Sequence, residues 1–202
     1  MNKSIFNTEF QQNDLTGKIV VGLERISEVF KSLLWEHAKA LGLSPIQIQI
    51  LIFIAYHKDE LCNVSHLAKE FSITKPTISD AVRVLEAKQL IHKTYGTADG
   101  RSYTISLSEE GTKVVERTHN FASPIKDQLD KMDISKLENV YQTLTKLIYS
   151  LNKTGVIGVQ RMCSGCKFYD GNDQKHYCHY IKNDILPNDL KLDCPEFEKK
   201  TP

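Results

Sequence analysis

Residues 72–111 read SITKPTISDAVRVLEAKQLIHKTYGTADGRSYTISLSEEG, and this stretch decides the fold. Its first half carries apolar residues at helical spacing behind a Thr and a Pro, which predicts a capped helix. Two alternating segments, 91–95 and 103–107, flank a turn that contains Gly and Asp, which predicts a hairpin. A helix followed by a hairpin is the order of a winged helix-turn-helix, in which the helix enters a major groove and the hairpin reaches the next groove.

The helix expected after residue 72 has two different faces. Ile78, Ala81, Val82 and Leu85 recur at helical spacing and are expected to face the core. The opposite face is polar and consists of Lys75, Thr77, Ser79, Asp80 and Arg83.

Three helices are expected before this segment. Apolar residues recur at helical spacing over 15–38, and Gly42 has the place of a left-handed cap. Ser44 and Pro45 are typical of a helix start, and the residues after them are apolar on every side, so this second helix should be central. Residues 64–71 predict a short third helix before the turn.

A long helix is expected over 135–151, where apolar residues follow at steps of three and four. They are Leu137, Val140, Leu144, Leu147 and Leu151. This seam is compatible with packing inside one chain or with a dimer interface. We favour the dimer, because two long terminal helices would flank one small domain. The expected fold is therefore mainly α, with a small β-hairpin wing and long terminal dimerisation helices.

The composition changes after Asn152. Residues 154–202 contain four of the five cysteines, few aliphatic residues and several aromatic ones. We place a domain boundary near Thr154 and Gly155. Residues 1–153 would form the winged-helix and dimerisation domain, and residues 154–202 a small Cys-rich module that binds a metal or a cluster.

The four cysteines of this module have the spacing C-x2-C-x11-C-x15-C and are Cys163, Cys166, Cys178 and Cys194. Four thiolates suit a [4Fe–4S] cluster or, alternatively, Zn²⁺, and redox thiols without metal are a third interpretation. Pro195 directly after the last cysteine favours the cluster, and the spacing is similar to that of high-potential iron–sulfur proteins. A zinc ribbon would normally have a second CxxC pair. His176 and His179 flank Cys178 and could replace one zinc ligand.

Residues 16–151 resemble the MarR family of transcriptional regulators. Three segments carry the resemblance: LSPIQIQIL in the second helix, ITKPTISDAVRVLEAKQLI across the recognition helix, and the pattern D-G-R followed by L-S-E-E-G at the hairpin. The residues of that last pattern are Asp99, Arg101, Leu107, Ser108 and Gly111. Ser108 stands where the family more often has Thr.

The resemblance implies a homodimer that reads a palindrome in double-stranded DNA. It implies that the outward side chains of the recognition helix, Lys75, Thr77, Ser79, Asp80 and Arg83, face the major groove. It places Arg101 in the minor groove at the tip of the wing, where a narrow groove attracts arginine, with Asp99 near enough to hold the guanidinium. It also implies a small-molecule effector in a pocket between the dimer helices and the DNA-reading domain.

Charge and composition limit the other classes of function. The net charge is only +1, although residues 74–103 hold five basic and three acidic side chains. The expectation of DNA binding therefore depends on the pattern of helix and hairpin and not on the overall charge.

No secretory leader and no apolar stretch of about 18–20 residues is visible, so we expect a cytoplasmic protein that does not enter the membrane. Reduced thiols in that compartment favour metal ligation over disulfides.

Three functions remain open from the sequence. The first is a MarR-like repressor whose tail reports metal, redox or oxidant state. The second is a ligand-responsive repressor with a structural zinc site in its tail. The third is an iron–sulfur electron-transfer protein. We find no nucleophile–base pair, no phosphate-binding loop and no substrate motif, so an enzyme is not expected.

Overall fold

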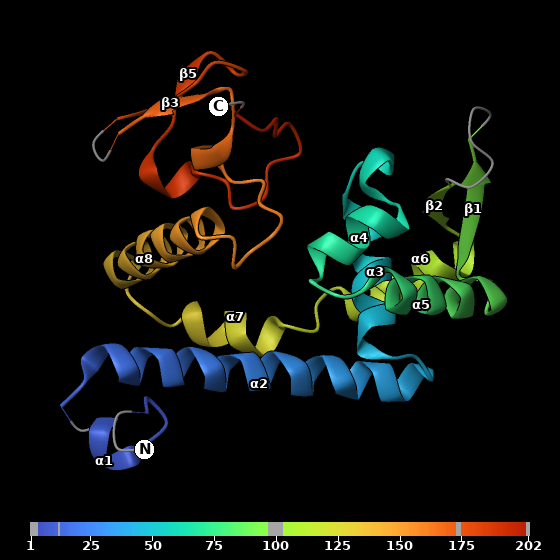
Figure 1. Cartoon of the computed structure of the whole chain (residues 1–202), viewed down its shortest axis with the longest axis horizontal. Coiled ribbons are helices and arrows are strands. Elements are labelled where there is room, and N and C mark those ends of the chain that lie inside the picture. The colour runs from blue at the N-terminus through green and yellow to red at the C-terminus, as the bar shows by residue number, and fades with distance from the viewer. Residues whose placement is uncertain (1–3, 12, 97–102, 173–174, 201–202) are drawn as a thin grey trace.

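A computed structural model describes residues 4–11, 13–96, 103–172 and 175–200. The long helix α2 (Leu15–Leu41) follows the short α1 (Thr8–Gln11) and runs along one side of the molecule (Figure 1). Gly42 ends α2 with φ of 61°, in the left-handed region, and its N–H donates to carbonyls of the last turn. The sequence pattern therefore placed this helix end correctly.

Helix α3 (Pro45–Tyr56) is the centre of the hydrophobic core. Ser44 caps it by accepting a hydrogen bond from the Gln47 N–H, and the Gln47 side chain accepts one from the Ser44 N–H. Ile48, Ile50 and Leu51 are fully buried. The expectation that this apolar helix is central is confirmed.

Two helices follow a short 3-10 turn, η1 (Asp59–Leu61). They are α4 (Val64–Glu70), which the Asn63 side chain caps, and α5 (Lys75–Ala87), which the Thr74 side chain caps. Ser72, in the turn between them, has φ of 53°. This pair is the helix-turn-helix that the sequence predicts.

The hairpin pairs β1 (Ile91–Tyr95) with β2 (Tyr103–Leu107), antiparallel and in the register Ile91↔Leu107. Helix α6 (Glu109–Thr118) follows directly, and Ser108 caps it by accepting from the Gly111 N–H. The Ser108 hydroxyl also donates to the Gln89 carbonyl at 2.7 Å, which joins the start of α6 to the end of α5. We call α3–α6 with this hairpin the reader domain.

The chain then leaves the reader domain through α7 (Ser123–Leu129) to the long helix α8 (Ile134–Lys153). The described residues after α8, 154–172 and 175–200, are called the tail. They form η2 (Cys163–Gly165), η3 (Pro187–Asp189) and a small antiparallel sheet in the order β3–β4–β5. Its strands are Tyr169–Gly171, His176–Cys178 and Asn183–Asp184.

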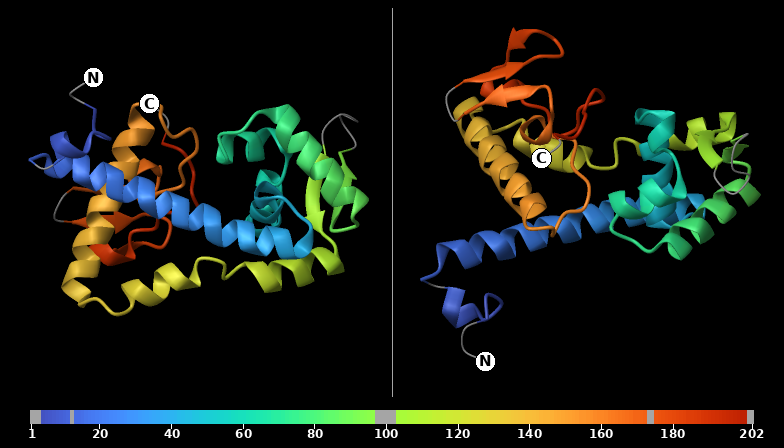
Figure 2. Two further views of the ribbon diagram at one scale, coloured as in Figure 1. Left: turned by 90° about the horizontal axis from the view of Figure 1, so that it is seen from below. Right: turned by 45° about the horizontal axis from the view of Figure 1, so that its top comes forward.

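The reader domain and the tail lie toward opposite ends of α2, as the further views show (Figure 2). Among the described residues, no single helix is long and apolar enough to span a membrane. Only α2 and α3 taken together meet that test of length and composition, and they are bent by 94°.

Candidate nucleic-acid interface and cysteine tail

Helix α5 turns a polar face to the solvent. Its apolar face is buried against the core through Ile78, Ala81, Val82 and Leu85, as the spacing predicts. Each outward candidate is exposed: Lys75, Thr77, Ser79, Asp80 and Arg83. Arg83 donates to Asp80 across one helical turn at 2.8 Å, with both side chains about 70% exposed. A pair this exposed contributes little to stability, so both groups are available to a ligand.

The wing lies beside the end of α5. Lys93 of β1 donates to Glu86 of α5 at 2.6 Å, and its ammonium lies 4.9 Å from the ring centre of Tyr103. These contacts fix the base of the hairpin against the recognition helix. The two candidates at the tip, Asp99 and Arg101, lie outside the described residues, so their roles stay predictions.

The other three cysteines of the tail lie near enough to Cys163 to act on the pKa of its thiol. Burial raises the pKa of the Cys163 thiol, and the nearby thiols of Cys194, Cys178 and Cys166 raise it further. In the opposite direction, the Lys191 N–H donates to the Cys163 sulfur at 3.2 Å and lowers the pKa. Backbone N–H groups that point at sulfur favour the thiolate, which is the form that binds metals.

The backbone forms two tight turns, which contain three of the four tail cysteines. In the first turn, the Cys166 N–H donates to the Cys163 carbonyl at 2.9 Å, and in the second, the Phe197 N–H donates to the Cys194 carbonyl at 3.1 Å. In the sheet, Cys178 pairs with Tyr169, and Tyr169 lies three residues after Cys166 in the chain. Backbone pairing therefore joins the strand of Cys178 to the segment that follows Cys166.

The side chains themselves do not close on a point. Across residues 4–11, 13–96, 103–172 and 175–200, no group of three His, Cys, Asp or Glu side chains has an arrangement that could hold a metal ion. His176 bonds to the Tyr169 hydroxyl at 2.6 Å, and His179 faces Asp170 at 4.0 Å. The donor set suits a thiophilic metal, but the four-thiolate site stays a prediction.

A cluster of charged side chains joins the tail to the reader domain. Arg161 donates to both carboxylate oxygens of Glu70, at the end of α4, at 2.8 and 3.1 Å. It also donates to Asp193 at 2.6 and 2.8 Å, and Asp193 lies 3.0 Å from His57 at the end of α3. We call these four residues the junction cluster. Beside it, Lys58 pairs with Glu196 at 3.0 Å.

The junction cluster is well shielded from water at its centre. The Arg161 side chain is only 10% exposed, and its guanidinium lies 5.5 Å from the ring centre of Phe53. Burial would raise the pKa of the Asp193 carboxyl, but the hydrogen bonds from Arg161 and His57 hold it below its ordinary value. A shielded, bidentate arginine is a strong and geometrically specific contact.

No local pattern in the sequence indicates the junction cluster. Its members are ordinary charged residues without a shared spacing, and they lie 104 and 91 positions apart in the pairs Arg161–His57 and Arg161–Glu70. Only the fold brings them together.

The other side of the tail contacts α8. The Tyr141 hydroxyl donates to the Leu190 carbonyl, and the Asn188 amide donates to Glu138 at 2.6 Å. The tail therefore lies against both the last long helix and the reader domain.

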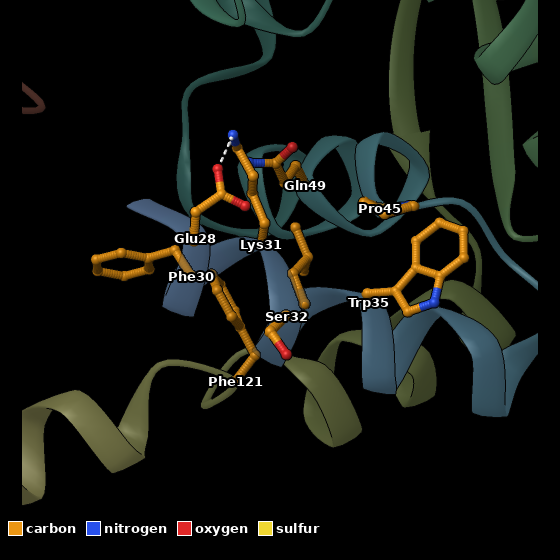
Figure 3. Close-up of a pocket in the computed structure, with 9 residues that line it drawn as sticks. Glu28, Phe30, Lys31, Ser32, Trp35, Pro45, Gln49 and Phe121 are labelled. Atoms are coloured by element: carbon orange, nitrogen blue, oxygen red, sulfur yellow. Dashed lines mark hydrogen bonds and ion pairs between the residues drawn. The ribbon is translucent and has the colours of Figure 1, made fainter. Parts of the chain in front are cut away.

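Helix α2 leaves a large apolar surface exposed. Its exposed residues include Leu15, Ile19, Val20, Leu23, Ile26, Val29, Phe30 and Trp35. A cavity of about 740 Å³ lies where this helix meets α3 and the segment after α6. Figure 3 shows Phe30 and Phe121 on one side of this cavity and Trp35 near Pro45 on the other. An apolar surface of this extent is typical of an interface rather than of a monomer.

Comparisons with known proteins agree with the fold. The MarR family model matches residues 41–102, which contain α3, α4, α5 and β1. The comparison with curated proteins gives no match. The fold is thus a mainly helical winged helix of the MarR type.

Several solved structures are similar to this chain. The S. aureus MepR–DNA complex is 25% identical with a TM-score of 0.58, and the alignment covers 65% of this chain and 97% of MepR. S. aureus MepR in a DNA-binding conformation is also 25% identical, with a TM-score of 0.58 and coverage of 66% and 98%. Streptococcus pneumoniae FabT in complex with DNA is 20% identical, with a TM-score of 0.57 and coverage of 68% and 97%, and supports the fold alone. About a third of this chain has no counterpart in them.

Proposed function

We propose that this protein is a sequence-specific transcriptional regulator, a repressor, that binds double-stranded DNA as a homodimer. The observation that carries the proposal is α5, a capped helix with a buried apolar face and an exposed polar face. Its position after α4 and before the hairpin is that of a recognition helix. MepR, whose sequence and fold are similar, has been solved in complex with DNA. The proposed role is cytoplasmic and is not enzymatic.

Five side chains of α5 would contact the major groove. Lys75 and Arg83 supply positive charge, whereas Thr77, Ser79 and Asp80 supply groups that can read base edges or orient the arginine. Asp99 and Arg101 at the tip of the wing would reach the minor groove. The low net charge of +1 predicts weak binding to random DNA, because non-specific affinity depends mainly on phosphate neutralisation.

The exposed apolar face of α2 supports the homodimer. Leu23, Ile26 and Phe30 are each about 40–47% exposed, which is costly for a helix that faces water. The apolar residues that recur at steps of three and four along α8 are also partly exposed, as Val140 and Leu147 show. A second copy of the chain would cover both helices.

The tail would add a metal-dependent property. Cys163, Cys166, Cys178 and Cys194 would bind one [4Fe–4S] cluster or, alternatively, one Zn²⁺, because four thiolates are a donor set that suits either. A metal-free redox role of these thiols is the third possibility. In the cluster form the tail would report redox or metal state to the reader domain.

The second candidate is a ligand-responsive repressor with a structural zinc site in the tail. The cavity lined by Phe30, Trp35 and Phe121 favours it, since it lies between α2 and the reader domain and has an apolar lining suited to a small molecule. An iron–sulfur electron-transfer protein is not favoured, because the recognition helix would then have no use.

The test is operator selection from random DNA, followed by affinity measurements over a range of salt concentrations. We expect a palindromic site with half-sites about 34–36 Å apart, bound by a dimer. The affinity should fall steeply with salt, by about 0.9 log units per log unit of salt for each neutralised phosphate. A monomer that selects no sequence would refute the proposal. The visible absorption spectrum of the protein purified without oxygen distinguishes the two metal forms, because an iron–sulfur cluster absorbs visible light and Zn²⁺ does not.

A further inference from the structure

We infer that the cleft between the tail and the reader domain is a binding site for a small polyanion, a molecule that carries several carboxylate or phosphate groups. The cleft has a volume of about 1380 Å³ and is lined by residues of α3, α4, the end of α8 and the tail. It is separate from the cavity beside α2, because the two have no lining residue in common. The site requires neither a metal nor the DNA-binding role.

Much of the positive charge in the cleft has no partner. Six of the lining residues are lysine or arginine. Two of these six are paired, since Lys58 binds Glu196 and Arg161 binds the carboxylates of the junction cluster. The other four form no ion pair within the described part of the chain and are Lys69, Lys153, Lys199 and Lys200.

The carboxylates at the cleft do not balance its cations. Glu60 and Asp193 line the cleft, and Glu70 and Glu196 pair with lining residues. Six cations against four carboxylates leave an excess of two positive charges, whereas the whole chain has a net charge of only +1. A recessed surface with walls of low dielectric strengthens the attraction of such an excess for an anion.

The cleft also contains buried hydrogen-bond donors that lack partners. Among the described residues, the buried side-chain atoms without a hydrogen-bond partner are His66 Nε2, Gln160 Nε2 and Ser164 Oγ, and all three residues line this cleft. His66 Nε2 has only a longer contact of 3.6 Å with Glu70. Buried polar groups in native proteins nearly always have a partner, so three such atoms in one cleft indicate a ligand that accepts hydrogen bonds.

The chemistry of these donors selects an anion. An imidazole N–H, an amide N–H and a hydroxyl can each donate, and carboxylate or phosphate oxygens accept strongly from them. The donors come from both walls, since His66 belongs to α4 whereas Gln160 and Ser164 belong to the tail. A ligand would reach these covered atoms by small rotations of the side chains, and donors recessed between two walls favour a compact molecule over a duplex or a protein surface.

The experiment measures the binding of two probes, citrate and tripolyphosphate, to the full-length protein by titration calorimetry at constant ionic strength. Citrate tests the carboxylate source and tripolyphosphate the phosphate source. We expect saturable binding of at least one probe, with one site per chain. The double variant Lys69→Ala/Lys199→Ala, which removes one unpaired lysine from each wall, should weaken this binding by about tenfold or more.

The matched control is the double variant Lys39→Ala/Lys146→Ala. Both of these lysines are exposed, form no ion pair within the described residues and lie outside the cleft. Because the control loses the same charge, it should bind the probe within about twofold of the wild type. Equal weakening in both double variants would show that bulk charge attracts the probe, and this would overturn the inference.

Gln160→Leu tests the unpaired donors without a loss of charge. Leucine has a similar size but cannot donate, so probe binding should weaken by about tenfold, as for a lost hydrogen bond to a charged group. Because the Gln160 amide nitrogen has no partner in the structure, thermal stability without the probe should be kept or raised. Unchanged probe affinity in Gln160→Leu would contradict the assigned role of the donors.

Arg83→Ala distinguishes the cleft from the recognition helix, which could attract the same anions as it would attract DNA phosphates. It should leave probe affinity unchanged, since Arg83 lies outside the cleft. Loss of binding in Arg83→Ala alone would place the anion on α5 and overturn the inference. An absence of saturable binding of both probes below about 1 mM would also overturn it, with ordered water as the content of the cleft. Neither result bears on operator binding, which is measured separately.

Discussion

Gly111 lies where the backbone of α6 meets that of Leu90, between α5 and β1. A Cβ atom at this residue would lie 1.9 Å from the Leu90 carbonyl oxygen, far closer than any non-bonded contact allows. The obstruction is backbone, so a side-chain rotation cannot relieve it. We predict that Gly111→Ala destabilises the protein by about 1–3 kcal/mol or more, as overpacked sites do. Thermal unfolding of the wild type and the variant measures this loss of stability.

Gly22 is the matched control for this prediction. It lies inside α2, and a Cβ there would meet nothing within 4 Å. Gly22→Ala should therefore raise the free energy of unfolding by roughly 0.5–1 kcal/mol, because alanine is the better helix former. Equal effects of the two substitutions would show that Gly111 is not sterically required.

Cys62 is the cysteine that we expect to stay unreactive. It is fully buried, and its thiol donates to the Lys58 carbonyl at 3.5 Å. Burial, with smaller contributions from Asp59 and Glu60, raises the pKa of Cys62 to about 11. Near pH 8 only about one thiol in a thousand would be thiolate, and thiolate is the reactive form.

We therefore predict that iodoacetamide leaves Cys62 unmodified in the native protein at about pH 8 and modifies it in urea. Mass spectrometry of peptides gives the extent at each cysteine. The tail cysteines of the chelator-treated protein provide the comparison and should react faster. Rapid native alkylation of Cys62 would contradict its burial. Cys62→Ser should also leave the metal content unchanged.

At the scale of elements, the exposed side chains at the start and middle of α5 contribute little to stability. Among the described residues, Arg83 forms an ion pair with Asp80 alone, in an exposed contact. We predict that Arg83→Ala weakens operator binding by about 1–3 kcal/mol, the range for a lost arginine contact with a base. Its thermal stability should stay within about 0.5 kcal/mol of the wild type, as for other surface substitutions.

Arg117 on α6 is the control for Arg83. It is also exposed, and its replacement by alanine removes the same charge from a different helix. Operator affinity should be nearly unchanged in Arg117→Ala. A similar loss in both variants would mean that bulk charge, and not the recognition helix, determines the affinity.

The elements that local chemistry specifies could be predicted from the sequence. Caps such as Ser44, Thr74 and Ser108 and the left-handed Gly42 mark helix ends by hydrogen bonds or φ angles within a few residues, and the structure has them in place. The alternating segments 91–95 and 103–107 are the observed strands. The exposure of the polar face of α5 was also predictable, because the apolar residues of this helix recur at helical spacing on the opposite face.

Features that depend on distant contacts could not be predicted. Helix α7 and the sheet of the tail have weak local patterns, and the junction cluster is formed by residues far apart in the chain. The cysteine spacing predicts a shared metal site because metal ligation has characteristic spacings, but spacing alone does not determine how the side chains are arranged, and no group of three His, Cys, Asp or Glu among the described residues could hold a metal ion.

At the scale of the whole molecule, we expect the exposed face of α2 to form the interface of the proposed homodimer. Ile26, in the middle of this helix, is 47% exposed, and a charge there would be buried in a dimer. We predict that Ile26→Glu shifts the protein to a monomer and abolishes high-affinity operator binding, because an unpaired buried charge costs several kcal/mol. Sedimentation equilibrium gives the mass.

Gln128→Glu adds the same charge at an exposed position on α7 and is the control. It should remain dimeric and bind the operator as the wild type does. A dimeric Ile26→Glu protein would place the interface elsewhere, and α8 would be the next helix to test.

The geometry of α2 also has a mechanical consequence. From Ile26 to Gly42 the helix extends about 24 Å, at 1.5 Å per residue, and the reader domain begins just beyond its end. A lever of this length converts a tilt of about 8° into a movement of about 3.4 Å, the rise of one base pair. A signal that rotates α2 by so small an angle can therefore shift the recognition helix by one full step along the operator.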